Sequence, residues 1–421
     1  MKEDIKETRL ENGLTILTDR MDGVRSATLG FFYRVGSRNE PVDLNGITHF
    51  IEHAVFKGTS KRSALEIAIE QDRLGGNLEA FTTHEETGFA IKVIDDQLES
   101  AFKLLADMMS DPVFDEKELR SEQRVIIEEL KMVEDSPEEY LGELFSEAFF
   151  PNHHLGLNIA GTARSVKTFD HAKTRYYFAR AFTPANLVIT AAGNVDHGKI
   201  VNLAKRLLPG QGRRTKARTQ KPKPAAPILI KQRKDLEQAH LIIATPFPGG
   251  RDKKRYAADM LANILGGGMS SRLWQKIREE RGLAYSVGAS AVMFRDCGYF
   301  TVYAGTSAHQ TGEVVDISIA EMSEIVKNGV TEQELDLAKR QAIASVLLSL
   351  EDSAARATTL AQCECLHGRQ IPVEETIRNI EAVTIADVRR LAREFFKTEK
   401  VAFAALGDLK GLKMPRSRLS I

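Results

Sequence analysis

The chain of 421 residues lacks the features that mark several classes of protein. Its 3 cysteines are an odd, sparse set, which argues against a disulfide framework and fits a reducing compartment. The N-terminus has no apolar core typical of a signal peptide, and no apolar run is long enough to span a bilayer. Basic and acidic residues balance at 58 each, so no global charge favours nucleic acid or a membrane surface. A soluble, cytoplasmic protein is expected.

The length of the chain predicts more than one domain, because 421 residues exceed one ordinary hydrophobic core. One compositional break, residues 211–227, is rich in arginine, lysine and proline and has no interleaved aromatic residues. It indicates an exposed linker, with a nucleic-acid-binding tail as the less favoured alternative. The predicted domains are therefore residues 1–210 and 228–421.

Short strands and helices alternate in the first domain. Residues 5–20 predict a hairpin with its turn at Asn12-Gly13, and strands are expected over 77–83 and 87–93. Helices are expected over 63–74 and 96–110, the first ending at a glycine pair.

The stretch His49-Phe50-Ile51-Glu52-His53 carries the chemistry. Residues four apart share a face of a helix, so His49 and His53 can hold one metal ion. Glu52 can reach a water on that metal without binding the metal itself. Two nitrogen ligands and a base are the minimum for metal-assisted hydrolysis. The alternative is a pair of surface histidines, but the flanking residues are apolar and would bury the helix.

A third ligand is expected from the helix predicted between Asp115 and about Glu134. At roughly 100° per residue, the apolar positions form one stripe, with Glu129 and Glu122 on its flank and Glu128 almost opposite. Glu129 is therefore predicted as the third ligand, and Glu122 as a partner that orients a ligating histidine. An ordinary helix with a charged flank has the same periodicity, so both interpretations stay open at this level.

The second half of the chain repeats features of the first. Capping boxes begin at Asp115 and at Thr331, 216 residues apart. This spacing replaces both predicted carboxylates by neutral residues, with Ala338 opposite Glu122 and Ser345 opposite Glu129. Matching glycines to helices places three further residues near the motif, with Ser270, Leu273 and Trp274 near His49, Glu52 and His53. The sequence thus predicts one scaffold present twice, once without the metal site, although a spurious repeat is the alternative.

These patterns resemble the inverted-zincin peptidases, the family of pitrilysin, insulin-degrading enzyme and mitochondrial processing peptidase. The motif is followed by Glu129 at 76 residues beyond His53, inside the run Arg124-Val-Ile-Ile-Glu-Glu129. The turn Gly75-Gly76-Asn77 and the segment Ser271-Arg-Leu-Trp274 with Arg278 and Tyr285 extend the resemblance over nearly the whole chain, which is similar to the short, processing-peptidase-like members.

The resemblance implies an α+β fold of two homologous domains from an internal duplication, each a mostly antiparallel sheet covered by helices. It implies one Zn²⁺ per chain, bound by His49, His53 and Glu129, with Glu52 as the base and Glu122 behind a ligand. It further implies a clamshell dimer around a chamber, in which the expected partner is an identical chain and a homologous subunit is the alternative.

Substrate contacts are also implied by the resemblance. Arg278 and Tyr285 match a pair that contacts substrate from the partner chain, where an arginine and a phenol can bind a carbonyl oxygen that gains negative charge. Helix-end packing is the alternative for both. An edge strand is expected to pair with an extended peptide, and it comprises Asn77, Leu78, Glu79, Ala80, Phe81 and Thr82.

The predicted function is a zinc-dependent endopeptidase that hydrolyses extended peptides inside the chamber, with Glu52 activating a water on the zinc. One alternative is a non-catalytic peptide-binding or scaffold subunit of a processing complex. Another is an amidase that uses the same metal geometry. No nucleic-acid or membrane partner is expected.

Overall fold

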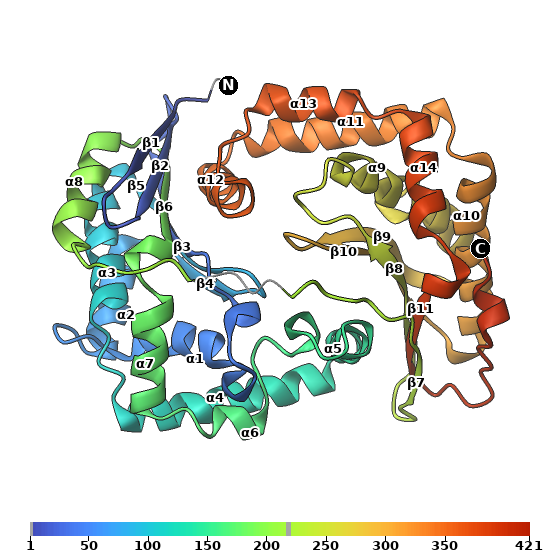
Figure 1. Ribbon diagram of the computed structural model, residues 1–421, viewed down its shortest axis with the longest axis horizontal. Helices are drawn as coiled ribbons and strands as arrows, with labels where there is room; N and C mark the ends of the chain where they lie inside the picture. The colour runs from blue at the N-terminus through green and yellow to red at the C-terminus, as the bar shows by residue number, and fades with distance from the viewer. Residues whose placement is uncertain (1–2, 216–219) are drawn as a thin grey trace. The chain divides into compact units, whose positions relative to one another are not determined.

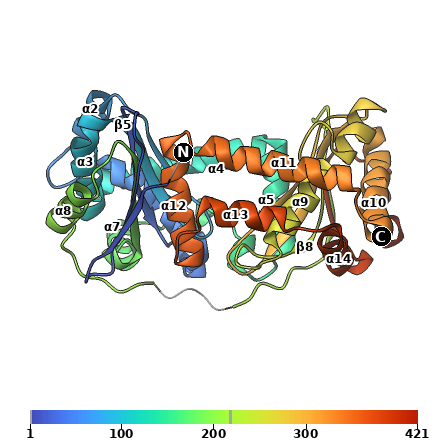
Figure 2. The same ribbon diagram turned by 90° about the horizontal axis from the view of Figure 1, so that it is seen from above.

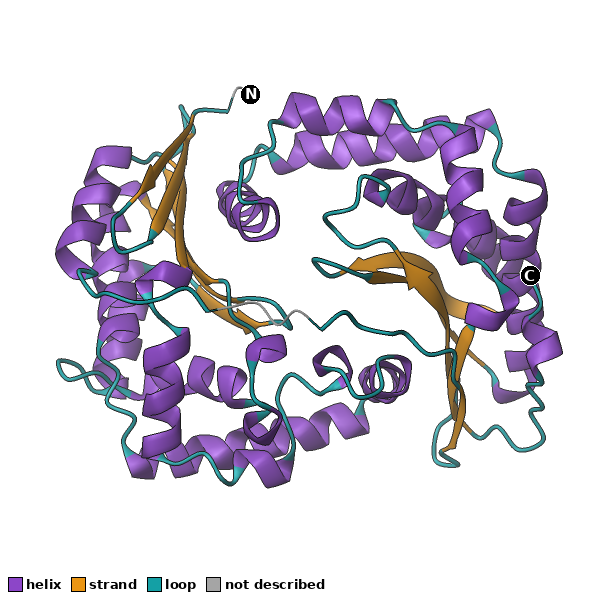
Figure 3. Cartoon of the chain, in the orientation of Figure 1, coloured by secondary structure: helices purple, strands orange, loops and turns teal. Residues whose placement is uncertain are grey.

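The computed structural model describes residues 3–215 and 220–421, so Met1, Lys2 and residues 216–219 of the predicted linker lie outside the described residues. The described chain forms two compact units, each built on one β-sheet (Figure 3). Unit 1 contains the described residues of 1–132, 157–219 and 347–372, and unit 2 contains those of 133–156, 220–346 and 373–421.

Unit 1 is built on a six-stranded sheet in the order β1-β2-β6-β3-β5-β4. All neighbouring strands are antiparallel except β2 and β6. The strands are β1 (Ile5–Arg9), β2 (Thr15–Arg20), β3 (Ser26–Tyr33), β4 (Leu78–Thr82), β5 (Thr87–Ile94) and β6 (Leu187–Gly193). The hairpin predicted over residues 5–20 is confirmed, and Gly13 in its turn has a φ of 88°, a conformation that favours glycine.

Helices of the first half enclose the main core of unit 1 against one face of this sheet (Figure 1). They are α1 (Ile47–Ala54), α2 (Ala64–Leu74), α3 (Leu98–Ser110), α4 (Glu116–Asp135), α6 (Ala163–Val166), α7 (His171–Ala181) and α8 (His197–Leu207). The core includes Phe31 from the sheet, Phe50 from α1 and Phe102 from α3, each fully buried. The sheet therefore fixes the position of α1, which carries the motif.

Unit 2 repeats this design on a five-stranded sheet in the order β7-β11-β8-β10-β9. Its strands are β7 (Ile228–Gln232), β8 (Ala239–Phe247), β9 (Ala284–Met293), β10 (Gly298–Thr306) and β11 (Ala402–Gly407). Its helices include α9 (Arg255–Gly266), a π-helix (Trp274–Glu279), α10 (Thr311–Asn328), α11 (Glu332–Ser349), α13 (Val373–Glu381) and α14 (Ile385–Phe395). Only β7 and β11 pair in parallel, so the predicted α+β fold with mostly antiparallel sheets is confirmed. Within the described ranges, no helix has the length and apolar composition needed to cross a membrane.

Each unit contains one helix from the other half of the sequence. Helix α5 (Pro137–Phe149) follows α4 in the chain but packs on β8 and β11 of unit 2. Helix α12 (Ser353–His367) follows α11 but packs on β2, β3 and β6 of unit 1 (Figures 1 and 2). The compact units therefore exchange residues 133–156 and 347–372, an arrangement that one cut at the linker does not describe.

The elements follow the same order in the two halves of the chain. β3, α1, α2, β4, β5, α3 and α4 correspond in order to β8, α9, the π-helix, β9, β10, α10 and α11. The counterpart of α1 is thus α9, which contains no histidine. Placing Ser270, Leu273 and Trp274 opposite the motif is wrong by one helix, because glycines flank several helices in each half and do not say which helices correspond.

Candidate metal centre

The helix that carries the motif begins without a capping side chain of its own. Its N-cap residue, Gly46, has a φ of 97° and offers no side-chain acceptor. The carboxylate of Glu40 takes this place by accepting the backbone N–H groups of Gly46 and Thr48, both at 2.8 Å. Glu40 is fully buried, and burial raises its pKa to about 7. The N-terminus of α1, which begins at Ile47, is therefore fixed two residues before His49.

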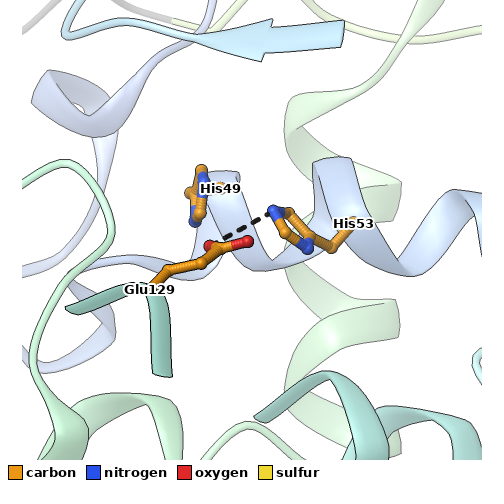
Figure 4. Close-up of side chains that lie close together, drawn as sticks. All are labelled: His49, His53 and Glu129. Carbon is orange, nitrogen blue, oxygen red and sulfur yellow. Dashed lines mark ion pairs between the residues drawn. The ribbon is translucent and has the colours of Figure 1, made fainter. Parts of the chain in front are cut away.

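The apolar side of α1 determines where its histidines lie. Phe50, Ile51 and Ala54 are buried in the core of unit 1. His49 and His53 are four residues apart and share the side of α1 that faces α4 (Figure 4). Their ring centroids are 4.7 Å apart, so two imidazoles are presented together.

Helix α4 brings a carboxylate to these imidazoles. Ligand atoms of His49, His53 and Glu129 all lie within 4.8 Å of one another (Figure 4). Glu129 Oε2 is 3.7 Å from His53 Nε2. Glu128 is 67% exposed in its side chain and instead pairs with Lys131 at 2.8 Å. The structure therefore brings together the three predicted ligands and leaves Glu128 outside the cluster, and within the described ranges no other group of this kind is present.

The residues present fit a zinc ion. Imidazole nitrogen and carboxylate oxygen are zinc ligands, and three protein ligands with an open fourth position are typical of catalytic sites. The buried Nδ1 of His49 has no hydrogen-bond partner among the described residues, so no protein group there occupies it. Burial, and secondarily the neighbouring His53, lowers the pKa of His49 to about 4. The ring is therefore neutral at pH 7, which is the form that binds metals.

Glu122 lies behind the second histidine, where the sequence places it. Its Oε2 is 3.2 Å from His53 Nδ1, and its Oε1 is 2.8 Å from Lys57 Nζ. Burial raises the pKa of Glu122, but these two partners outweigh it and hold the pKa below its usual value. An ionised Glu122 accepts from Nδ1–H and leaves Nε2 of His53 free on the side of Glu129. Lys57 was not predicted, because it lies beyond the end of α1, in the 3-10 turn Val55–Lys57.

Glu52 contacts the edge strand. It is 8% exposed, and its Oε2 accepts a 2.6 Å hydrogen bond from Thr82 Oγ1. Burial raises the pKa of the Glu52 carboxyl above its usual value. Thr82 is the last residue of β4, so the predicted base and the predicted substrate strand are in direct contact.

Strand β4 has one free edge among the described strands, because it pairs only with β5. Asn77 precedes the strand, and the other five predicted substrate residues form it. The tip of the β4–β5 hairpin is held by the loop that also contains Glu40. Ser37 N–H donates to Thr83 O at 3.1 Å, and Arg38 Nη1 donates to Glu85 Oε1 at 2.6 Å. One short loop therefore holds both the strand and the helix of the motif.

The predicted substrate-contacting pair lies in unit 2. Arg278 belongs to the π-helix and Tyr285 to β9. The guanidinium carbon of Arg278 is 4.4 Å from the centroid of the Tyr285 ring, and Nη1 donates to Tyr285 O at 2.7 Å. The structure thus brings this pair together within its own unit.

The fold and the cluster define a duplicated α+β protein with one candidate metal centre, and comparisons with known proteins identify its family. Residues 15–163 match the model of the insulinase family, peptidase family M16, and residues 168–342 match the M16 inactive domain. The chain is 37% identical to an uncharacterized zinc protease of Streptomyces coelicolor, over 98% of this chain and 91% of that protein. It is also 37% identical to the uncharacterized zinc protease YmxG of Bacillus subtilis, over 96% of this chain and 98% of that one.

The chain therefore belongs to the insulinase family of peptidases, M16, and the family predicted from the sequence is confirmed. A solved structure of a protease from Helicobacter pylori matches with a TM-score of 0.88 at 23% identity, covering 96% of this chain and 99% of that one. This match shows a shared fold.

Proposed function

We propose that this chain is a zinc-dependent endopeptidase whose catalytic centre lies in the domain of residues 1–210. The convergence of His49, His53 and Glu129 beside Glu52 is the observation that carries the proposal. When bound by these three side chains, zinc supplies a Lewis acid for hydrolysis of an amide. The family and the zinc-protease relatives support this assignment.

Glu52 is proposed as the general base. Its burial and its raised pKa make it more basic than an exposed carboxylate, which suits proton transfer near neutral pH. The hydroxyl of Thr82 occupies Oε2 and leaves Oε1 for the proton of the attacking water. The same carboxyl group then delivers this proton to the leaving amine.

An extended peptide is proposed as the substrate. The free edge of β4 offers backbone groups to which a peptide can add as a further strand. Because Thr82 ends this strand and contacts Glu52, a peptide paired with β4 would lie beside the proposed base. This geometry favours peptides over the small amides that an amidase hydrolyses.

A dimer is proposed in which Arg278 and Tyr285 of one chain serve the centre of the other. A mixed dimer tests this arrangement by pairing a Glu52→Gln chain with an Arg278→Ala chain. Contribution in trans predicts one intact centre and recovered activity, whereas no recovery would argue for contribution within one chain.

A non-catalytic, peptide-binding subunit is the second candidate. The match of the second half to a domain described as inactive favours it. The complete ligand set and base in the first half favour catalysis instead. Zinc content and turnover, measured on one sample, separate the two.

The experiment is metal analysis of the purified chain combined with mass spectrometry of products from a peptide library. The proposal predicts about one zinc per chain, cleavage that stops on chelation, and recovery when zinc is returned. Cleavage that persists without the metal would overturn it. Full zinc without cleavage would favour the non-catalytic subunit.

A further inference from the structure

The guanidinium of Arg278 contacts two aromatic rings. Its guanidinium carbon is 4.2 Å from the ring centroid of Trp274 and 4.4 Å from that of Tyr285. Trp274 is the only tryptophan of the chain and lies one helical turn before Arg278, at the start of the π-helix. Both distances are within the range of cation–π attraction.

The stacking restricts how Arg278 can bind a ligand. A guanidinium is planar and carries five N–H donors in its plane. Nη1 donates to Tyr285 O, and in the described part of the chain the guanidinium makes no other hydrogen bond. Nε lies 4.0 Å from Glu279 Oε1, in an ion pair, so the donors of Nη2 remain available at the edge of the plane. The group that suits this edge is an oxygen acceptor lying in the plane, such as a peptide carbonyl.

Trp274 is the more firmly held of the two rings. Its Nε1 donates to Glu279 Oε1 at 2.9 Å, and its ring packs against the core of unit 2. Tyr285, in contrast, is 78% exposed. An arginine side chain without such a contact loses conformational entropy when it binds a ligand. A ring that already restricts the side chain in the free protein lowers this entropic cost of binding.

We propose that Trp274 is a positioning residue that holds the guanidinium of Arg278 edge-on for a carbonyl oxygen of the peptide substrate. The proposal rests on the proposed peptidase function. It adds a residue that acts only through Arg278, and this dependence makes it testable.

A double-mutant cycle tests the dependence on peptide turnover. Trp274→Leu is expected to lower kcat/KM roughly two- to fivefold, the factor that corresponds to an exposed cation–π contact, with zinc content unchanged. Trp274→Phe keeps a ring face and is expected to recover most of the loss. In an Arg278→Ala background, Trp274→Leu should cause no further loss. The proposal is overturned if Trp274→Leu costs the same factor in both backgrounds, or if Phe is as harmful as Leu.

Fluorescence gives a readout that needs no turnover, because all tryptophan emission comes from Trp274. Arg278→Ala should uncover one face of the indole and shift its emission to the red. Arg281→Ala, three residues further on and outside the stack, is the matched control and should leave the emission unchanged. An unshifted Arg278→Ala spectrum would overturn the proposal, whatever the peptidase activity proves to be. Absence of turnover in the unaltered chain would instead overturn the proposed function.

Discussion

Thr82 Oγ1 donates a 2.6 Å hydrogen bond to Glu52 Oε2, and this bond joins the last residue of the edge strand β4 to the proposed base. Thr82→Val removes the donor while keeping the shape of the side chain. We expect kcat/KM to fall roughly 10- to 150-fold, because a hydrogen bond to a charged group contributes about 1.5–3 kcal/mol and this bond fixes the proposed base. Steady-state peptide hydrolysis at equal zinc content measures the effect. Thr82→Ser is the control, and full activity of Thr82→Val would contradict the role given to this bond.

Glu129 and Glu128 are adjacent acids that face different surroundings. Glu129→Gln should weaken zinc binding by about 100-fold or more, since it removes a proposed anionic ligand and not only an outer partner. Glu128→Gln should leave the affinity unchanged, because its carboxylate pairs with Lys131. Competition with a chromophoric chelator measures both affinities. Equal losses in the two variants would show that the helix-face assignment is wrong.

A substitution of Glu40 tests whether the stability of α1 depends on a hydrogen-bond acceptor outside the helix. Gln in its place offers one acceptor oxygen where the carboxylate receives Gly46 and Thr48 separately, each at 2.8 Å. Glu40→Gln should lower the free energy of unfolding by about 1–2 kcal/mol. Asp43→Asn, an exposed acid of the same loop, should have little effect. Chemical denaturation measures both, and an unchanged Glu40→Gln chain would contradict the capping role.

The hydrogen bonds of Asp107 predict that the stability of the protein depends on pH. Its Oδ2 accepts from Thr59 Oγ1 and Arg62 Nη1, both at 2.7 Å. Burial raises the pKa of Asp107, but these bonds outweigh it and lower the pKa below the ordinary value. A depressed pKa contributes stability above the unfolded-state pKa, and this contribution is lost as the pH falls through the folded-state pKa.

Asp107→Asn should therefore lower the midpoint of thermal unfolding at pH 7, by an amount that shrinks as the pH falls below about 4. The control Asp72→Asn changes an exposed acid of α2. Thermal unfolding followed from pH 7 to pH 3 measures the gap. A gap for Asp107→Asn that stays constant over this range would contradict the assignment.

Local patterns predict which side chains meet in the candidate metal centre, because helical periodicity decides which side chains share a face. The pairing of His49 and His53 follows from their spacing, whereas the apolar stripe places Glu129 on its flank and leaves an ordinary charged flank open. The contact between Thr82 and Glu52 could not be predicted in this way, since it depends on how β4 packs on α1. The acceptor for α1, Glu40, lies in a loop whose path carries no periodic signal.

The exchange of helices between the units could not be predicted from the sequence, for a related reason. An amphipathic pattern shows that α5 and α12 bury one face, but it does not say which sheet they cover. The matching of the two halves by their capping boxes agrees with the structure, because α4 and α11 begin at Glu116 and Glu332, 216 residues apart, and hold the same place in the order of elements. The matching is wrong for Trp274, because there it depended only on the positions of glycines.

The most direct test of the account is the Glu52→Gln variant, examined for zinc content and peptide hydrolysis on one sample. The amide keeps the size of the side chain but cannot take a proton from water. We predict a full complement of zinc, as in the unaltered chain and in the Glu128→Gln control, with hydrolysis reduced at least about 100-fold. Hydrolysis at the rate of the unaltered chain, with zinc retained, would contradict the assignment of Glu52 as the base.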